Sequence, residues 1–326
     1  MAIEPDTDAG AERLRIVGIM GSGRSGSTLL EYLLAGYICD SHALGELEGL
    51  LERAVADNEL CSCGEPAQDC ARWQKLLASL ESTSWWRTLD AWRTDRRRRI
   101  PWGAALVGAA AVRRLLGIER IPIPGSGRRP VAHYTELLTA LGHERFHTDV
   151  LIDNSKTPLH FFTLAATGRV DLAVVQVVRK PQALIWSWRR ATYLPEARDK
   201  DWTFEPRPAT RVARAWLFDL AMSAAFRITH KNVPFVRISY EELCADPSAT
   251  LRRCTRALGL PTGDEPARPA DYHVVGGNPA RFGRFTEIRI DDEWESGMSR
   301  ELKAVLGITL GPVYRWVSRR SSGNTV

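Results

Sequence analysis

Residues 15–37 read RIVGIMGSGRSGSTLLEYLLAGY, and this stretch decides the fold. The short apolar run from Arg15 to Met20 predicts a buried strand, and leucines three and four residues apart in 28–38 predict a helix. Glycines at positions 21, 23 and 26 lie between the two segments. The pattern is therefore strand, glycine-rich loop, helix, and the start of such a helix can receive an anion.

The same alternation of strand and helix continues along the chain. The run after Asp171 is almost continuously apolar, which is typical of a central parallel strand covered on both faces. We therefore expect an α/β fold, a P-loop-like three-layer domain with a central parallel sheet flanked by helices. The further expected strands cover residues 41–44, 150–152, 171–178 and 233–238. One expected helix runs through Leu47, Leu50 and Leu51, and two others start at Pro158 and Pro181. Further helices are expected over residues 134–141, 209–230 and 240–258.

We expect one domain over residues 14–320, preceded by a flexible N-terminus at 1–13. Residues of about 85–145 form a mainly helical insertion in this interpretation, with a break rich in Pro and Gly at 121–130. The arginine run at 96–99 predicts a solvated face, and attraction to an acidic acceptor or a membrane surface is the alternative.

The composition is that of a globular protein: of 326 residues, 44% are hydrophobic and 25% are charged. The net charge of +5 is a mild basic excess, which suits an anionic ligand and does not by itself indicate nucleic-acid binding. The polar start lacks the pattern of a signal peptide, and no run reaches the roughly 18 apolar residues that cross a bilayer. We therefore expect a soluble, cytoplasmic protein without a nucleic-acid partner.

The glycine-rich loop has the chemistry of an anion site. Arg24 supplies a fixed positive charge with bidentate geometry, and the hydroxyls of Ser25, Ser27 and Thr28 supply further donors. Gly26 lets the backbone turn sharply and approach a ligand closely. These features, followed by a helix, predict binding of a phosphate or sulfate group.

The loop has a second interpretation as a nucleotide triphosphate site. The spacing of residues 18–25, GIMGSGRS, is that of a Walker A loop with Arg in place of Lys. An ATP- and magnesium-dependent phosphotransferase is therefore one alternative, and a non-catalytic nucleotide-binding module is another. The missing lysine counts against the phosphotransferase, because it normally reaches the terminal phosphates.

Residues 23–30, GRSGSTLL, resemble the 5′-phosphosulfate-binding loop of sulfotransferases that use 3′-phosphoadenosine 5′-phosphosulfate (PAPS). A second segment, VVRKP at 177–181, resembles the 3′-phosphate site of the same family, with Arg179 at a strand end and Ser187 eight residues later. The matches cover roughly 14–73 and 151–294 and are similar to bacterial members, which are related to tyrosylprotein and carbohydrate sulfotransferases. The resemblance implies transfer of a sulfuryl group from PAPS to an acceptor hydroxyl by in-line displacement.

The resemblance also implies which residues bind the nucleotide. Residues 24–28, namely Arg24, Ser25, Gly26, Ser27 and Thr28, would hold the 5′ end, and Arg179 and Ser187 would hold the 3′-phosphate. Tyr240, in a Tyr-Glu-Glu-Leu segment, matches a tyrosine that contacts the nucleotide in tyrosylprotein sulfotransferases. Arg281 lies in a segment that closes over the nucleotide in the wider family.

Three residues are implied in the chemistry. Glu46, which follows Ala-Leu-Gly, matches the proposed base of tyrosylprotein sulfotransferases, and Glu48 and His42 are the alternatives. Lys156 resembles the strand-end lysine that stabilises the sulfuryl group. Arg24 would also contact the bridging oxygen.

The donor PAPS is the one co-substrate that the resemblance requires, and it requires no metal. Cys61, Cys63 and Cys70 cluster in CSCGEPAQDC, but three thiolates without a Cys-x-x-Cys pair favour ordinary buried or loop thiols over a zinc site. The sequence does not distinguish between a small molecule, a saccharide and a lipid as the molecule that carries the acceptor hydroxyl. A peripheral membrane contact and a homo-oligomer are both compatible with the sequence.

Overall fold

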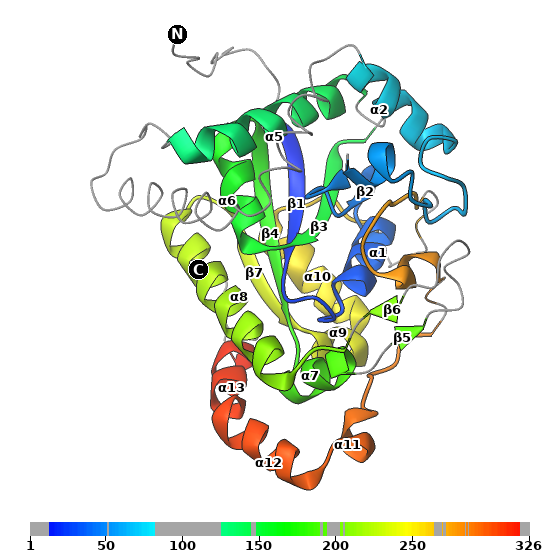
Figure 1. Cartoon of the computed structure of the whole chain (residues 1–326). Helices are drawn as coiled ribbons and strands as arrows, with labels where there is room; N and C mark the ends of the chain where they lie inside the picture. The colour runs from blue at the N-terminus through cyan, green and yellow to red at the C-terminus, as the bar shows by residue number, and fades with distance from the viewer. Residues whose placement is uncertain are drawn as a thin grey trace.

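The centre of the protein is a five-stranded parallel sheet in the order β2-β3-β1-β4-β7 (Figure 1). The computed structural model describes residues 13–50, 52–81, 125–144, 148–189, 192–193, 203–204, 206–263, 269, 272–283, 285 and 287–319. The sheet strands are β1 (Leu14–Met20), β2 (Ser41–Gly45), β3 (Val150–Lys156), β4 (Val170–Val178) and β7 (Phe235–Ser239). The predicted P-loop-like α/β fold with a central parallel sheet is thus confirmed.

Helices cover both faces of this sheet (Figure 1). One face packs against α1 (Ser27–Tyr37), α9 (Tyr240–Ala245) and α10 (Pro247–Leu258). The other face packs against α2 (Ala71–Glu81), α5 (Gly125–Glu144), α6 (Pro158–Thr167) and α8 (Ala209–Thr229). A third cluster joins α8 to α7 (Pro181–Arg189), α12 (Arg300–Thr309) and α13 (Gly311–Arg319). The short elements are η1 (Glu52–Ala56), β5 (Thr192–Tyr193), β6 (Thr203–Phe204), η3 (Pro279–Phe282) and α11 (Trp294–Gly297).

Strand β1 explains why the sheet is buried on both sides. Ile16 and Met20 belong to the core beneath α2, α5 and α6, whereas Val17 and Ile19 belong to the core beneath α1, α9 and α10. Successive side chains of a strand point to opposite faces, so an unbroken apolar run serves two cores at once. Gly18 faces the ring of Phe161 in α6, where a Cβ atom would lie 2.3 Å from the ring, so a larger residue would clash.

The predicted continuous helix over 240–258 is wrong, because the structure divides it into α9 and α10. The break falls at Asp246 and Pro247. Proline cannot donate the backbone hydrogen bond that would continue α9, and it is favoured in the first turn of α10. The Asp246 carboxylate accepts a hydrogen bond from the Ala249 amide and caps α10, which ends at Gly259 in the left-handed region.

Two further helix predictions differ from the structure. The helix expected through Leu47, Leu50 and Leu51 begins later than predicted: a bend and turns cover 47–49, Leu50 is helical, Leu51 lies outside the described residues, and the short π-helix η1 follows. The amides of Leu47 and Glu48 donate to side chains of β3. The break expected at 121–130 is helical from Gly125 onward in α5. Residues 1–12, 82–124 and 145–147 lie outside the described residues, so the flexible N-terminus, most of the insertion and the arginine run at 96–99 stay predictions.

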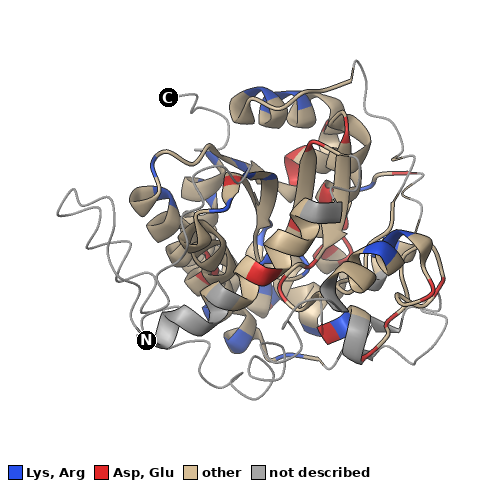
Figure 2. Ribbon diagram, turned by 90° about the horizontal axis from the view of Figure 1, so that it is seen from above, with Lys and Arg blue, Asp and Glu red and all other residues tan. Residues whose placement is uncertain are grey.

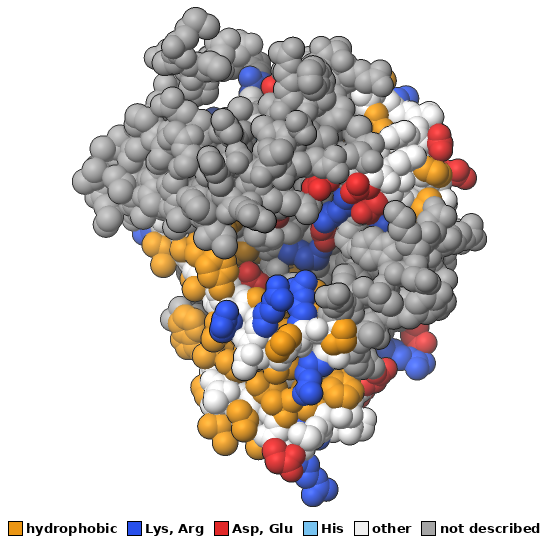
Figure 3. Space-filling view, in the orientation of Figure 1, with side chains coloured by type: hydrophobic (Ala, Val, Ile, Leu, Met, Phe, Trp, Pro, Cys, Tyr) orange, Lys and Arg blue, Asp and Glu red, His pale blue; other side chains and the backbone are white. Residues whose placement is uncertain are grey.

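Basic and acidic residues are interspersed around the described ribbon (Figure 2). The lower part of the face in Figure 3 combines Lys and Arg with hydrophobic side chains. Exposed hydrophobic residues of α8 include Leu217 and Phe218, which are 39% and 49% exposed. Within the described part of the chain, no helix combines the length and the apolar character needed to cross a bilayer.

Candidate active site

The carboxyl ends of the five parallel strands bring together most of the predicted site residues. The glycine-rich loop follows β1, Glu46 follows β2, and Lys156 ends β3. Arg179 follows β4 and Tyr240 follows β7. Parallel strands present these ends at one edge of the sheet, where ligands of open α/β sheets bind. Five segments that are far apart in the sequence therefore form one site.

The glycine-rich loop leaves anion-binding groups available at the start of α1. Gly26 is the N-cap of α1 with φ 93°, and a Cβ atom here would lie 2.4 Å from the Tyr240 ring. Among the described residues no side chain caps this N-terminus, so the first amides of α1 retain donors for a ligand. The Ser25 hydroxyl is buried and has no hydrogen-bond partner in the described part of the chain. A loop with these features fits a phosphate or sulfate group.

The side chain of Arg179 contacts the backbone of Arg24. The Arg179 guanidinium donates from Nη1 to the Arg24 carbonyl oxygen over 2.9 Å and lies over the Tyr240 ring, 4.3 Å from its centroid. The Arg24 guanidinium lies 5.7 Å from the centroid of Trp188. The Trp188 indole donates to the Gly23 carbonyl oxygen over 2.9 Å, which attaches α7 to the loop. The loop after β1, the end of β4 and α7 are thus in direct contact.

Asp291 occupies part of the hydrogen-bonding capacity of Arg179. Its Oδ2 atom lies 2.8 Å from Arg179 Nη2, and its backbone amide donates to the Tyr240 hydroxyl over 3.2 Å. The side chain of Arg179 is 6% exposed and that of Asp291 is 31% exposed, so the guanidinium is buried while its partner reaches solvent. A buried cation needs such a partner, and the carboxylate takes a position that another anion could take.

Glu46 is held between two cations. Its Oε1 atom accepts a hydrogen bond from Lys156 Nζ, and its Oε2 atom lies 2.8 Å from Arg53 Nη1. Burial alone would raise the pKa of Glu46, but Lys156 and Arg53 outweigh burial and hold that pKa below its ordinary value. Glu46 is therefore ionised at neutral pH. Gly277 completes the wall, where a Cβ atom would lie 3.1 Å from Glu46 Oε1.

A buried network positions the backbone next to Glu46. The Asp153 carboxylate accepts hydrogen bonds from the Leu47 amide over 3.3 Å and from the Ser155 hydroxyl over 2.5 Å. The Ser155 hydroxyl oxygen accepts from the Glu48 amide over 2.8 Å. On its other side Asp153 lies 2.5 Å from His160 Nε2. Strand β3 thereby fixes the turn that carries Glu46.

The sequence profile of the sulfotransferase family matches residues 17–264, a range that includes the glycine-rich loop, Glu46, Lys156, Arg179 and Tyr240. The chain belongs to the sulfotransferase family. No curated protein matches it.

Three solved sulfotransferase structures are similar to this sulfotransferase. A domain from the curacin biosynthetic pathway is 17% identical with a TM-score of 0.43, over 92% of this chain and 98% of that chain. A domain from the Synechococcus PCC 7002 olefin synthase is 18% identical with a TM-score of 0.38, over 92% and 95%. Sulfotransferase STF1 from Mycobacterium tuberculosis H37Rv is 16% identical with a TM-score of 0.45, over 97% and 78%.

The two alternative bases of the sulfotransferase differ from Glu46 in their surroundings. His42 is buried in β2 at 1% exposure, with its ring 6.3 Å from that of Trp73. Burial, with Arg72 and His273 nearby, lowers the pKa of His42 to about 3, so the ring is neutral at neutral pH. The backbone of Glu48 is fixed by Ser155, whereas the Glu46 carboxylate contacts Lys156 directly.

Two predicted nucleotide-binding residues, Ser187 and Arg281, do not lie directly at the strand ends of the sulfotransferase. Ser187 is on α7, the helix that follows Arg179, and is buried. Arg281 is 4% exposed, and its guanidinium donates to the carbonyl oxygens of Gly277 and Leu60 over 3.2 and 3.3 Å. These contacts attach Arg281 to the wall beside Glu46 rather than to Arg179, and its role in nucleotide binding stays a prediction.

Glu31 is a site residue that the sequence analysis missed. It is buried in α1, where its carboxylate accepts hydrogen bonds from the Gly45 amide over 2.9 Å and from Asn154 Nδ2 over 3.0 Å. Burial raises the pKa of Glu31 to about 7, although its hydrogen bonds oppose the rise. The sequence signal that could have identified Glu31 is a single acidic residue within the otherwise uncharged helix α1. Its contacts join α1, β2 and β3 directly behind Glu46.

The Glu31→Gln variant is expected to change how stability depends on pH. Because burial raises the pKa of Glu31 from 4.5 to about 7, the folded protein binds a proton more strongly than the unfolded chain. This group therefore stabilises the fold at low pH, and the contribution is lost as pH rises through 7. The unfolding free energy of the wild type minus that of the variant should be roughly 2 kcal/mol larger at pH 5 than at pH 8 in urea titrations. An equal difference at both pH values contradicts this assignment.

Proposed function

We propose that this sulfotransferase transfers a sulfuryl group from PAPS to an acceptor hydroxyl by in-line displacement. One observation carries the proposal: the guanidinium of Arg179 hydrogen bonds to the backbone of Arg24, so that the end of β4 lies against the glycine-rich loop. PAPS carries phosphate groups at its 3′ and 5′ positions, and a site for it needs a cation for each. Family membership supports the transfer reaction in general.

The loop after β1 is suited to the 5′-phosphosulfate. The Ser25 hydroxyl has an unused hydrogen-bonding capacity within the described residues, and the N-terminal amides of α1 have no side-chain cap there. Ser27 and Thr28 belong to the first turn of α1 and add hydroxyls. Arg24 supplies the charge that favours an anion at this position. These groups would hold the donor at its reactive end.

The end of β4 is suited to the 3′-phosphate. Arg179 Nε is buried and has no hydrogen-bond partner in the described part of the chain, while Nη2 is paired with Asp291. A phosphate would take the place of the Asp291 carboxylate on this guanidinium and use the remaining donor as well. Ser187 on α7 would add a hydroxyl. Tyr240 would contact the nucleotide with the ring that also packs against Gly26.

Glu46 and Lys156 are suited to the chemistry. PAPS supplies an activated sulfuryl group with a good phosphate leaving group. Glu46, ionised and within the site, would accept the proton of the acceptor hydroxyl. Lys156, whose ammonium contacts Glu46 and the Asn154 carbonyl oxygen, would stabilise the negative charge on the transferred group. Arg24 would stabilise charge on the bridging oxygen. Positioning and electrostatics dominate in related phosphoryl transfer, and we propose the same here.

Calorimetric titration tests the donor. Adenosine 3′,5′-bisphosphate and ADP carry the same number of phosphates but differ in their attachment, so a site with a separate 3′-phosphate group discriminates between them. We expect the bisphosphate to bind more tightly, with no requirement for magnesium. Tighter binding of ADP that depends on magnesium would overturn the proposal in favour of the phosphotransferase. Binding of PAPS without transfer to any acceptor hydroxyl would favour the non-catalytic module.

We propose that the acceptor is a hydroxyl-bearing small molecule, saccharide or lipid. Transfer assays with radiolabelled PAPS against an alcohol series from each class would identify it. Product formation with amines but with none of the alcohols would contradict a hydroxyl acceptor.

A further inference from the structure

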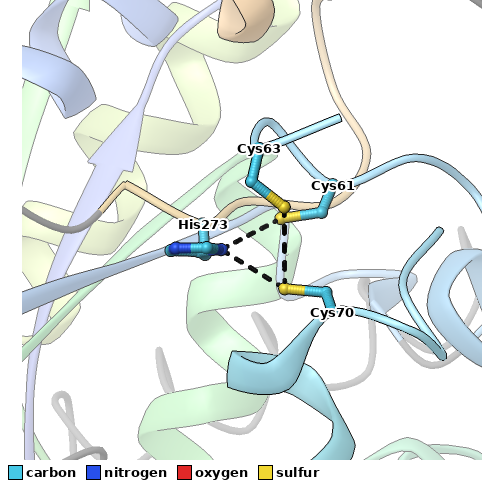
Figure 4. A group of neighbouring side chains, drawn as sticks. All are labelled: Cys61, Cys63, Cys70 and His273. Carbon is cyan, nitrogen blue, oxygen red and sulfur yellow. Dashed lines mark hydrogen bonds between the residues drawn. The ribbon is translucent and has the colours of Figure 1, made fainter. Parts of the chain in front are cut away.

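Four potential metal ligands converge outside the site described above. Cys61, Cys63 and Cys70 come from the loop before α2, and His273 comes from the segment before η3, 203 residues after Cys70 (Figure 4). The four donor atoms lie within 4.8 Å of one another. His273 Nδ1 lies 3.2 Å from Cys70 Sγ and 3.6 Å from Cys61 Sγ, and Cys63 Sγ lies 3.8 Å from Cys70 Sγ. We propose that these residues bind a structural zinc ion.

The separations fit a tetrahedral site. Zinc bonds of about 2.3 Å to sulfur and 2.0–2.1 Å to nitrogen place tetrahedral ligands about 3.6 Å apart for a sulfur and a nitrogen and about 3.8 Å apart for two sulfurs. The distances of 3.6 Å between His273 and Cys61 and 3.8 Å between Cys63 and Cys70 have these values, and the 3.2 Å between His273 and Cys70 needs only a small adjustment. Three cysteines and one histidine form a ligand set that structural zinc sites use.

The backbone holds the cysteines in place without help from a metal. The Gly64 amide donates to the Cys61 carbonyl oxygen over 2.8 Å, and Gly64 has φ 96°, a conformation that favours glycine in this tight turn. The Cys61 amide donates to the Glu65 carbonyl oxygen over 2.8 Å. The Cys70 amide donates to the Pro66 carbonyl oxygen over 2.9 Å at the start of α2. These bonds fix the backbone at Cys61 and Cys70, and the three thiols converge on His273.

The histidine is held against the same loop. The Ser62 hydroxyl donates to the Tyr272 carbonyl oxygen over 2.7 Å and accepts from the Val274 amide over 2.9 Å, so it bonds to both neighbours of His273. Cys61 also forms an antiparallel bridge with Val275. The two segments are therefore in register, with the imidazole facing the sulfurs.

The burial and the charge of the four ligands suit a structural zinc ion that can enter from solvent. Cys61 and Cys70 are buried, whereas Cys63 is exposed and offers a path from solvent. Zinc would bind as the three thiols release their protons to water, and three thiolates with one neutral imidazole leave a net charge of −1 on the complex. Arg72 acts electrostatically on His273 and would offset this charge. Four protein ligands leave no coordination position for substrate, so the ion is structural rather than catalytic.

The position of the cluster gives the ion a definite role. Val275 pairs with both Cys61 and Gly45, which directly precedes Glu46, and Gly277 lies against the Glu46 carboxylate. The zinc site would therefore fix the wall of the active site to the cysteine loop. Three thiolates without a Cys-x-x-Cys pair favoured ordinary thiols in the sequence, but His273 adds a fourth potential ligand from a distant segment.

Metal analysis of the full chain tests the proposal without an activity assay. We expect the purified protein to contain an equimolar amount of zinc, and X-ray absorption to find three sulfur ligands at about 2.3 Å and one nitrogen at about 2.0 Å. Removal of the ion by a chelator should lower the thermal unfolding midpoint, and zinc chloride alone should restore it. Substitution by Co²⁺ should give the absorption bands of tetrahedral thiolate coordination.

Variants locate the ion. Cys70→Ala and His273→Ala should lose the zinc, whereas Cys254→Ala, which alters a buried cysteine of α10 outside the cluster, should retain it. His273→Cys keeps four ligands and should retain zinc with a fourth sulfur in the absorption spectrum, even if the alanine variants fold poorly. A zinc-free wild type that does not take up zinc, a disulfide between two of the three cysteines, or zinc retained by both Cys70→Ala and His273→Ala would overturn the proposal.

Discussion

Replacing Arg179 by alanine is expected to weaken binding of adenosine 3′,5′-bisphosphate roughly 10- to 100-fold, the loss typical of hydrogen bonds to a charged group. AMP, which has a 3′-hydroxyl in place of the 3′-phosphate, should lose much less affinity. The reason is that the guanidinium of Arg179 is the buried cation at the end of β4 and has a donor to spare for a phosphate. Calorimetric titration of both ligands into both proteins measures the difference.

Two further variants separate recognition from folding. Arg256→Ala removes an exposed arginine of α10 and should leave both affinities unchanged. Arg179→Lys retains the positive charge but not the bidentate geometry of the guanidinium, so its loss of affinity for the bisphosphate should be intermediate. Equal losses for the bisphosphate and AMP in Arg179→Ala would show that Arg179 does not contact the 3′-phosphate.

Replacing Glu46 by glutamine is expected to lower kcat roughly 10²- to 10⁴-fold, the usual contribution of a general base. Glutamine has a similar shape but cannot accept the proton of an acceptor hydroxyl. Affinity for adenosine 3′,5′-bisphosphate should change little, because Glu46 lies among Lys156 and Arg53 rather than at Arg179. Steady-state kinetics with PAPS, together with calorimetry, separates these two effects.

Glu48→Gln is the matched control for this prediction. Glu48 lies two residues away on the same turn, and it was the alternative base. We expect its kcat to stay within a few-fold of the wild type. A larger loss in Glu48→Gln than in Glu46→Gln would transfer the role of base to Glu48.

Much of this site could be predicted because its signals are local. The loop after β1 combines glycines, a cation and hydroxyls within a few residues, and Arg179 directly follows the most apolar strand. The resemblance to the sulfotransferase family implied roles for Glu46, Lys156 and Arg179, and the ends of parallel strands bring these residues to one edge of the sheet.

The features of the site that could not be predicted depend on contacts between segments that are far apart in the sequence. Arg53 reaches Glu46 from the π-helix η1, where a regular helix was expected. Asp291 meets Arg179 across 112 residues, and His273 meets Cys61 across 212. No local periodicity encodes such pairs. The turn before η1 also depends on a distant segment, because the amides of Leu47 and Glu48 donate to the side chains of Asp153 and Ser155, 106 and 107 residues away.

The pairing of Arg179 with Asp291 bears on turnover. In the proposed reaction, the Asp291 carboxylate would return to the Arg179 guanidinium as the bisphosphate product departs, so that the buried cation regains a partner. Dissociation would then exchange one anion for another on the same guanidinium. Product release limits the turnover rate of many enzymes. Asp291 would therefore help the product to dissociate from a site that binds the donor tightly.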